Sequence, residues 1–223
     1  MNNQKMNQWL KERNLICEES FGEALYTLAI DYSHENDVSL SSVWDLLGVS
    51  KQNINFWKYH DQSSTTHLKL KRNAITNAKI IFQLEESEAN ELAMKSGIVW
   101  DVIRTDAEKE QMYKSLFASK LKSYTGKKRN LYEAAGLSKT SFHYIITGEK
   151  IRKEKLISVL ILMGSSKTEI QEILNAAGYC LSKSYLVDIV INYLLLQSSS
   201  KDNGIRKLNK INDVLYELGL PLI

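Results

Sequence analysis

Apolar residues recur along most of this chain at intervals of three and four, the spacing of one face of an α-helix. Proline, which interrupts helices, occurs once, at Pro221. Strict alternation of apolar and polar residues, typical of a half-buried strand, is almost absent. The pattern predicts an all-α protein with helices at 19–33, 40–47, 51–59, 71–84, 87–96, 105–124, 130–135, 139–147, 153–163, 167–177, 183–197 and 205–218.

Two of these helical stretches have nearly the same sequence pattern. Residues 44–59 read WDLLGVSKQNINFWKY, and 88 positions later residues 132–147 read YEAAGLSKTSFHYIIT. A sharp turn between two helices needs a residue with positive φ, which glycine adopts cheaply, and a serine two positions later can cap the next helix. Gly48 with Ser50, and Gly136 with Ser138, supply both requirements.

The similarity continues beyond the turn. After a surplus of seven residues in the first copy, Arg72, Ile75, Ala78, Ile81, Leu92 and Gly97 align with Lys153, Leu156, Val159, Leu162, Ile173 and Gly178. The repeat predicts a tandem duplication of a five-helix unit of about 80 residues, long enough to close a small core.

The duplication predicts three parts: a first domain at 1–98, a second domain at 99–179 and a C-terminal helical extension at 180–223. The extension has no counterpart in the first copy. Its apolar run, 185–196, must be buried, and two alternatives are open: packing on the second copy of the same chain, or a dimer interface.

The two turns resemble the helix-turn-helix of lambda-repressor-like, or Xre-type, DNA-binding proteins. The resemblance covers roughly 19–98 and 105–179. It implies two tandem five-helix domains, each with a recognition helix just after the glycine turn, at 51–59 and 139–147. Such a helix lies in the DNA major groove and contacts base edges near its start.

In the second copy, the positions expected to face DNA carry hydroxyl and imidazole groups, with cations on either side for phosphates. The candidate DNA-binding residues are Lys128, Lys139, Thr140, Ser141, His143, Tyr144, Lys150, Arg152 and Lys153.

In the first copy, the corresponding candidates are Lys51, Gln52, Asn53 and Asn55, whose amides suit adenine. Residues 38–50, however, carry no basic residue. The family commonly has a phosphate-contacting Gln where this chain has Leu40, and the second copy has Lys128 there. Basic residues return at Lys58, Lys69, Lys71 and Arg72. Whether the first copy touches DNA or is a degenerate copy used for pairing or partner recognition stays open.

Charge is unevenly distributed, although the net charge is only +3. From Lys114 to Lys155 there are 11 basic and 3 acidic residues, whereas from Glu12 to Asp45 there are 1 basic and 8 acidic. A basic stretch of this kind can meet a polyanion such as double-stranded DNA.

Other classes of function find little support. No glycine-rich phosphate loop and no nucleophile with a base at motif spacing occurs, so we expect no enzyme. The cysteines Cys17 and Cys180 are far apart and the four histidines are scattered, so we expect plain buried thiols, no metal and no cofactor. No apolar run reaches the roughly 20 residues of a membrane span, and the N-terminal segment does not resemble a secretory signal, so we expect a cytoplasmic protein.

The sequence therefore predicts a sequence-specific DNA-binding transcriptional regulator, a repressor, that acts mainly through the second copy. The alternative is a protein-interaction module, such as an antitoxin-like or adaptor protein, whose helix-turn-helix units bind protein. The acidic stretch at 12–45 and the aromatic residues Trp44, Phe56, Trp57 and Tyr59 favour that alternative. A homodimer is compatible with either function.

Overall fold

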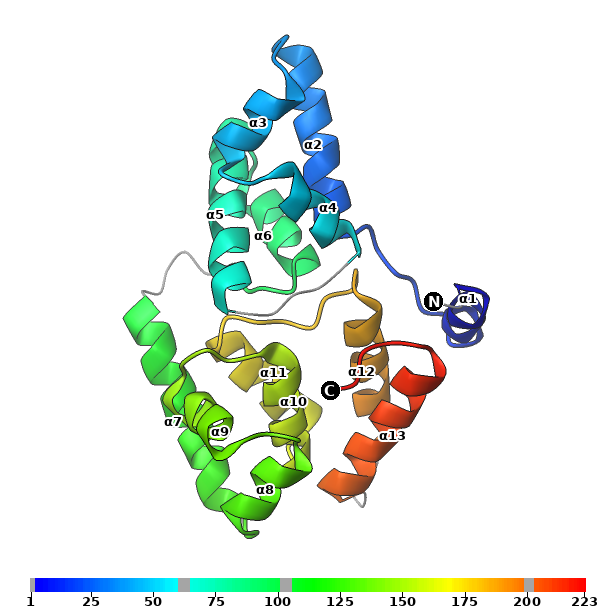
Figure 1. Cartoon of the computed structure of the whole chain (residues 1–223), viewed down its shortest axis with the longest axis vertical. Coiled ribbons are helices and arrows are strands. Elements are labelled where there is room, and N and C mark those ends of the chain that lie inside the picture. Colours follow the sequence, from blue (N-terminus) through cyan, green and yellow to red (C-terminus); the bar gives the residue numbers. More distant parts are fainter. Residues whose placement is uncertain (1–2, 60–64, 101–105, 199–202) are drawn as a thin grey trace. The chain divides into compact units, whose positions relative to one another are not determined.

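The structure is a computed structural model that describes residues 3–59, 65–100, 106–198 and 203–223. These ranges contain thirteen α-helices and no strand, which confirms the all-α class (Figure 1). None of the described helices is both long and apolar enough to span a membrane.

The chain forms two compact units, which differ in charge. The acidic unit comprises Cys17–Trp100 and Ser182–Tyr185, with 8 basic and 12 acidic residues. The basic unit comprises Met1–Ile16, Asp101–Leu181 and Leu186–Ile223, with 21 basic and 14 acidic residues. Residues 1–16, which we predicted in the first domain, thus belong to the same unit as the second copy and the extension.

The acidic unit has five helices around an apolar core that includes Phe21, Leu25, Ile54, Trp57 and Ile75. Helix α2 contacts α3, α4 and α6, and α5 contacts α3 and α6. The helices are α2 (Phe21–Glu35), α3 (Leu40–Leu47), α4 (Lys51–Tyr59), α5 (Thr65–Ile81) and α6 (Glu86–Lys95).

The basic unit has eight helices and is built around α10. Every residue from Leu156 to Met163 is buried, and α10 contacts α8, α11 and α13. The helices are α1 (Asn3–Glu12), α7 (Asp106–Ser123), α8 (Lys128–Ala134), α9 (Lys139–Thr147), α10 (Lys153–Leu162), α11 (Lys167–Ala176), α12 (Leu186–Gln197) and α13 (Gly204–Glu217).

Helices α2 to α6 and helices α7 to α11 make corresponding contacts. The pairs α2 with α4, α2 with α6, α3 with α5, and α5 with α6 recur as α7 with α9, α7 with α11, α8 with α10, and α10 with α11. The helix ends correspond as well: the Ile98 and Tyr179 N–H groups donate to the Ala93 and Leu174 carbonyls, each just after a glycine with positive φ.

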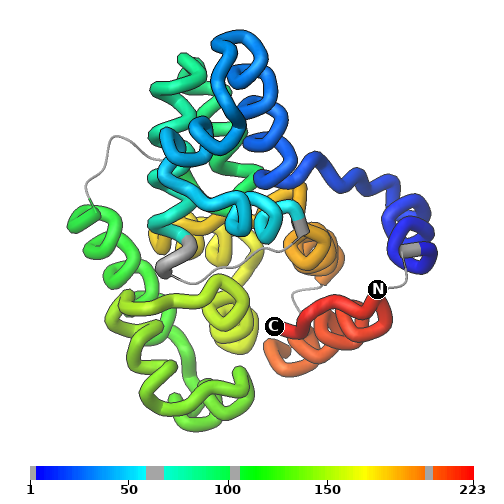
Figure 2. Tube along the Cα trace, turned by 45° about the horizontal axis from the view of Figure 1, so that its top comes forward, coloured from blue at the N-terminus to red at the C-terminus, as the bar shows by residue number. Residues whose placement is uncertain are grey.

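Apart from residues 182–185, the extension packs inside the basic unit. Helices α12 and α13 contact each other and lie side by side in both views (Figures 1 and 2). Helix α13 begins at Gly204, where an added Cβ would lie 2.5 Å from the Ile161 carbonyl oxygen, so only glycine permits this approach to α10. Helix α12 packs on α13 and on α11 of the second copy, so most of the apolar run is covered within the same chain, although Leu196 is 62% exposed.

Most helix bounds lie within two residues of the predicted ones, and three helices differ by more. Helix α1 was not predicted. Helix α5 begins at Thr65, six residues before the predicted start, because part of the surplus segment is helical, and it ends at Ile81, three residues before the predicted end. Helix α12 begins at Leu186 rather than 183, because residues 182–185 are bonded to the acidic unit instead. The predicted start of the helix at 105 lies outside the described residues.

Candidate nucleic-acid interface

The turn between α8 and α9 is formed as the sequence predicts. Gly136 has φ of 62°, and nothing lies within 4 Å of the Cβ that another residue would add, so the backbone conformation alone requires glycine. The Leu137 N–H donates to the Tyr132 carbonyl at 2.8 Å. Ser138 caps α9 by accepting the Ser141 N–H at 3.0 Å. These bonds set the direction in which α9 leaves the turn.

Helix α9 is anchored to the unit by its buried face. Phe142 and Ile145 are buried, and the Phe142 ring contacts that of Tyr132 with centroids 5.8 Å apart. The Tyr113 hydroxyl of α7 donates to the Ile145 carbonyl at 2.6 Å. Burial raises the pKa of Tyr113, which keeps its hydroxyl a proton donor.

The opposite face of α9 carries most of the predicted base-reading residues. Lys139, Thr140 and His143 are exposed, while Ser141 and Tyr144 are half-buried. The Ser141 hydroxyl lies 2.9 Å from that of Ser138, so it is already engaged in the cap. Thr140 and His143 are therefore the side chains best placed to reach an external ligand.

Exposed cations stand before and after α9. Lys127, Lys128 and Arg129 lie at the start of α8, and Lys150 and Arg152 lie in the segment after α9. Arg129 pairs with Glu133 at 2.8 Å, but both side chains are exposed, so the pair is weak and leaves the guanidinium accessible. The Lys150 ammonium lies 5.5 Å from the centre of the Tyr144 ring.

Lys153 does not belong to this surface, and the prediction that it contacts DNA is wrong. The residue is 1% exposed, and its ammonium lies 2.7 Å from a carboxylate oxygen of Asp188 in α12. A charge held in a buried pair cannot reach a phosphate without breaking that pair.

Helix α4 of the acidic unit presents the predicted amides. Lys51, Gln52 and Asn55 are exposed, and Asn53 is half-buried with its N–H donated to the Ser50 hydroxyl at 3.2 Å. Gly48 has φ of 68°, so the turn has the same form as that before α9.

Fewer cations surround α4 than α9. Lys51 and Lys69, which align with Lys139 and Lys150, are exposed, but the three cations that precede α9 have no counterpart before α4. Ser39, Leu40 and Ser41 occupy the positions of Lys127, Lys128 and Arg129. Lys58 lies on the ring of Tyr26, with 3.7 Å from its ammonium to the ring centre. Lys71, another cation expected near this copy, is buried and donates to the Ser96 carbonyl at 2.9 Å.

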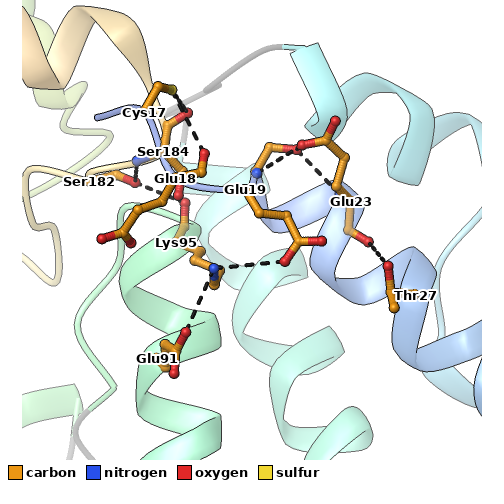
Figure 3. A network of polar contacts seen from close by, with 10 residues as sticks. Cys17, Glu18, Glu19, Glu23, Thr27, Glu91, Lys95, Ser182 and Ser184 are labelled. Atoms are coloured by element: carbon orange, nitrogen blue, oxygen red, sulfur yellow. Dashed lines mark hydrogen bonds and ion pairs between the residues drawn. The ribbon is translucent and has the colours of Figure 1, made fainter. Parts of the chain in front are cut away.

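A polar network at the start of α2 holds residues 182–185 against the acidic unit (Figure 3). The Ser182 hydroxyl donates to the Lys95 carbonyl at 3.0 Å, and the Lys95 ammonium lies 3.8 Å from Glu19. The Cys17 thiol lies 3.4 Å from the Ser184 carbonyl oxygen.

Cys17 is exposed rather than buried, contrary to expectation. Partial burial of the sulfur, followed by the charges of Glu23 and Glu18, raises the pKa of the Cys17 thiol. The thiol is therefore a poor nucleophile near neutral pH. Among the described residues, no three His, Cys, Asp or Glu side chains are grouped as a metal site requires.

Two tyrosines that sequence reasoning missed hold the ends of the candidate interface. Tyr113 bonds the end of α9, and the Tyr179 hydroxyl donates to the Ile151 carbonyl at 2.9 Å, just after Lys150. Their partners lie 32 and 28 residues away in the chain, so no local pattern could have indicated these bonds.

Comparisons with known proteins give no relative: no family model, no curated protein and no solved structure matches the chain.

Proposed function

We propose that the protein is a sequence-specific DNA-binding transcriptional regulator, a repressor, that reads double-stranded DNA with α9. The observation that carries the proposal is the arrangement of exposed cations around one exposed polar helix. Lys127, Lys128 and Arg129 precede α9, and Lys150 and Arg152 follow it.

This arrangement suits the two tasks of a DNA-binding protein. Cations bind phosphates and release counterions, which supplies affinity without regard to sequence. Thr140 and His143 can form hydrogen bonds with base edges, which supplies the choice of sequence. The major groove is wide enough to admit an α-helix such as α9.

We further propose that α2 to α6 and α7 to α11 are two lambda-repressor-like domains, of which only the second binds DNA strongly. The equivalent helix contacts and the equivalent glycine turns support the duplication. The net negative charge of the acidic unit, the absence of cations before α4, and the engagement of Lys58 and Lys71 inside the unit argue against tight phosphate binding there.

Binding to DNA fragments from the source genome, measured by electrophoretic shift at low salt, tests the proposal. We expect saturable binding that weakens steeply as salt rises. Lys128→Ala and Arg152→Ala should weaken binding to all fragments, whereas Lys210→Ala, an exposed cation on α13, serves as the control that leaves binding unchanged. Absence of saturable binding by the unaltered protein would contradict the proposal.

A protein partner for the acidic unit is the second candidate function. Leu46 of α3 is 52% exposed beside a turn without cations, and an exposed leucine suits a protein surface better than a phosphate backbone. Purification from native cells should return a stoichiometric protein that Leu46→Asp releases and His143→Ala does not. Recovery of DNA alone would contradict this second function.

A further inference from the structure

The segment between α9 and α10 has a backbone that needs support. Gly148 and Lys150 both have positive φ, 83° and 39°. The left-handed region is uncommon for a lysine and costs roughly 1 kcal/mol. Lys150 and Arg152 will therefore keep their positions only if the surrounding structure holds this segment.

One support comes from the second copy itself. Ile151, between the two cations, is buried, and its carbonyl accepts the Tyr179 hydroxyl at 2.9 Å. This bond fixes the middle of the segment against the end of α11.

The other support comes from the C-terminal extension. Lys153 is the first residue of α10 and directly follows Arg152, and its ammonium pairs with Asp188 in the first turn of α12. Both side chains are 2% exposed. The pair ties the end of the cation-bearing segment to a helix that the first copy lacks.

A buried ion pair gives little net stability, because desolvation of the two charges offsets their attraction, and an apolar pair of similar volume often serves as well. What the ion pair supplies, and an apolar pair does not, is a directional N–H···O bond at a fixed distance.

We propose that Asp188 is a positioning residue for DNA binding. Through Lys153 it holds Lys150 and Arg152 where both reach phosphates on one side of α9. The inference rests on the proposed function, and it makes the C-terminal extension part of the support of the DNA-binding surface.

Two variants separate positioning from stability. Asp188→Asn leaves the Lys153 ammonium buried without its charged partner and should lower both the unfolding temperature and DNA affinity. The double variant Lys153→Met/Asp188→Leu replaces the pair with apolar groups and should regain stability. Leu215→Ala, in the buried face of α13, is the control that lowers stability without removing the ion pair.

DNA affinity is measured by fluorescence anisotropy, in which the full chain is titrated into a genomic fragment that it binds. The titrations are repeated at several salt concentrations, at a temperature well below the unfolding temperature of each variant. The double variant should bind about 10-fold more weakly, and the slope of log K against log salt should shrink by about 1 to 2, because each lost phosphate contact removes about 0.9. Leu215→Ala should keep the unaltered slope. Equal slopes for the double variant and the unaltered protein would overturn the proposal.

Amide hydrogen exchange in the DNA-free protein distinguishes failure of this inference from failure of the proposed function. The double variant should exchange faster at 150–152 than the unaltered protein. Faster exchange in a protein that binds no DNA would support the anchoring by Asp188 but refute a role in DNA binding. Unchanged exchange would overturn the anchoring itself.

Discussion

The acidic and basic units contain the same helix-glycine-helix turn but differ in the charges that surround it. Ser39, Leu40 and Ser41 precede the turn in the acidic unit, and Lys127, Lys128 and Arg129 occupy the same positions in the basic unit. The turn fixes the geometry of the following helix in both cases. Turn geometry and the ability to bind a polyanion are therefore separate properties, encoded by different residues.

The two copies, α2 to α6 and α7 to α11, also differ in what covers their fourth helix. Because Ile75 aligns with Leu156, Ile80 of α5 corresponds to Ile161 of α10. Ile80 is 71% exposed, whereas Ile161 is fully buried and lies against Gly204 at the start of α13. The extension therefore turns a surface position of one copy into a core position of the other.

The largest expected effect concerns this pair of isoleucines. Ile161→Ala should lower the free energy of unfolding by about 2–5 kcal/mol, and Ile80→Ala by less than about 0.5 kcal/mol. Urea unfolding followed by circular dichroism measures both. Tryptophan fluorescence adds a reporter of the acidic unit, which holds Trp44, Trp57 and Trp100. Equal losses of unfolding free energy from Ile161→Ala and Ile80→Ala would refute the inference that the extension buries α10 where α5 is exposed.

The next effect concerns the cations before α9. Lys127→Ser/Lys128→Leu/Arg129→Ser gives the basic unit the residues of the acidic one. DNA affinity should fall about 100-fold in an anisotropy titration at low salt, because each phosphate contact to a charged side chain contributes about 1 kcal/mol. Lys11→Ser/Arg206→Ser/Lys210→Ser removes three exposed cations from α1 and α13, which is the same change in charge, and is the matched control. A similar loss from the control would mean that net charge alone decides binding.

A smaller effect is expected for base reading. His143→Ala should reduce discrimination between the preferred fragment and an unrelated one by about 1–3 kcal/mol, with little change for the unrelated fragment. Asn55→Ala, at the matching position of α4, should leave discrimination unchanged. Competition titrations with both fragments measure the difference. If Asn55→Ala reduces discrimination more than His143→Ala does, base reading by α9 rather than α4 is refuted.

The smallest effect concerns the anchor of α9. Tyr113→Phe removes the hydroxyl that donates to the Ile145 carbonyl and should lower the free energy of unfolding by about 1 kcal/mol. Urea unfolding measures it, with Tyr216→Phe, an exposed tyrosine of α13, as the control. A loss no greater than that of the control would show that this bond contributes nothing.

Local signals in the sequence predicted the helices around both turns. Helices α3, α4 and α9 begin and end at the predicted residues. Serine caps mark the starts of all three, and left-handed glycines mark the ends of α3 and α9. Helix α1 was not predicted. The start of α12 was misplaced because residues 182–185 are bonded to partners such as Lys95, far away in the chain.

The candidate site was predictable only in part, because the burial of some of its residues depends on partners far away in the chain. Exposure of Thr140 and His143 follows from helical periodicity, which is local. The burial of Lys153 depends on Asp188, 35 residues later, and that of Lys71 on the Ser96 carbonyl, 25 residues later. A cation in a sequence pattern does not reveal whether a distant partner removes it from the surface.

Selection of bound fragments from genomic DNA would show whether the basic unit binds DNA through α9. The unaltered full chain and the Lys127→Ser/Lys128→Leu/Arg129→Ser variant would be compared, with the bound fragments then titrated at several salt concentrations. We predict a shared sequence among the fragments bound by the unaltered chain, and its loss in the variant. No enrichment by the unaltered chain, or equal enrichment by both, would contradict the account.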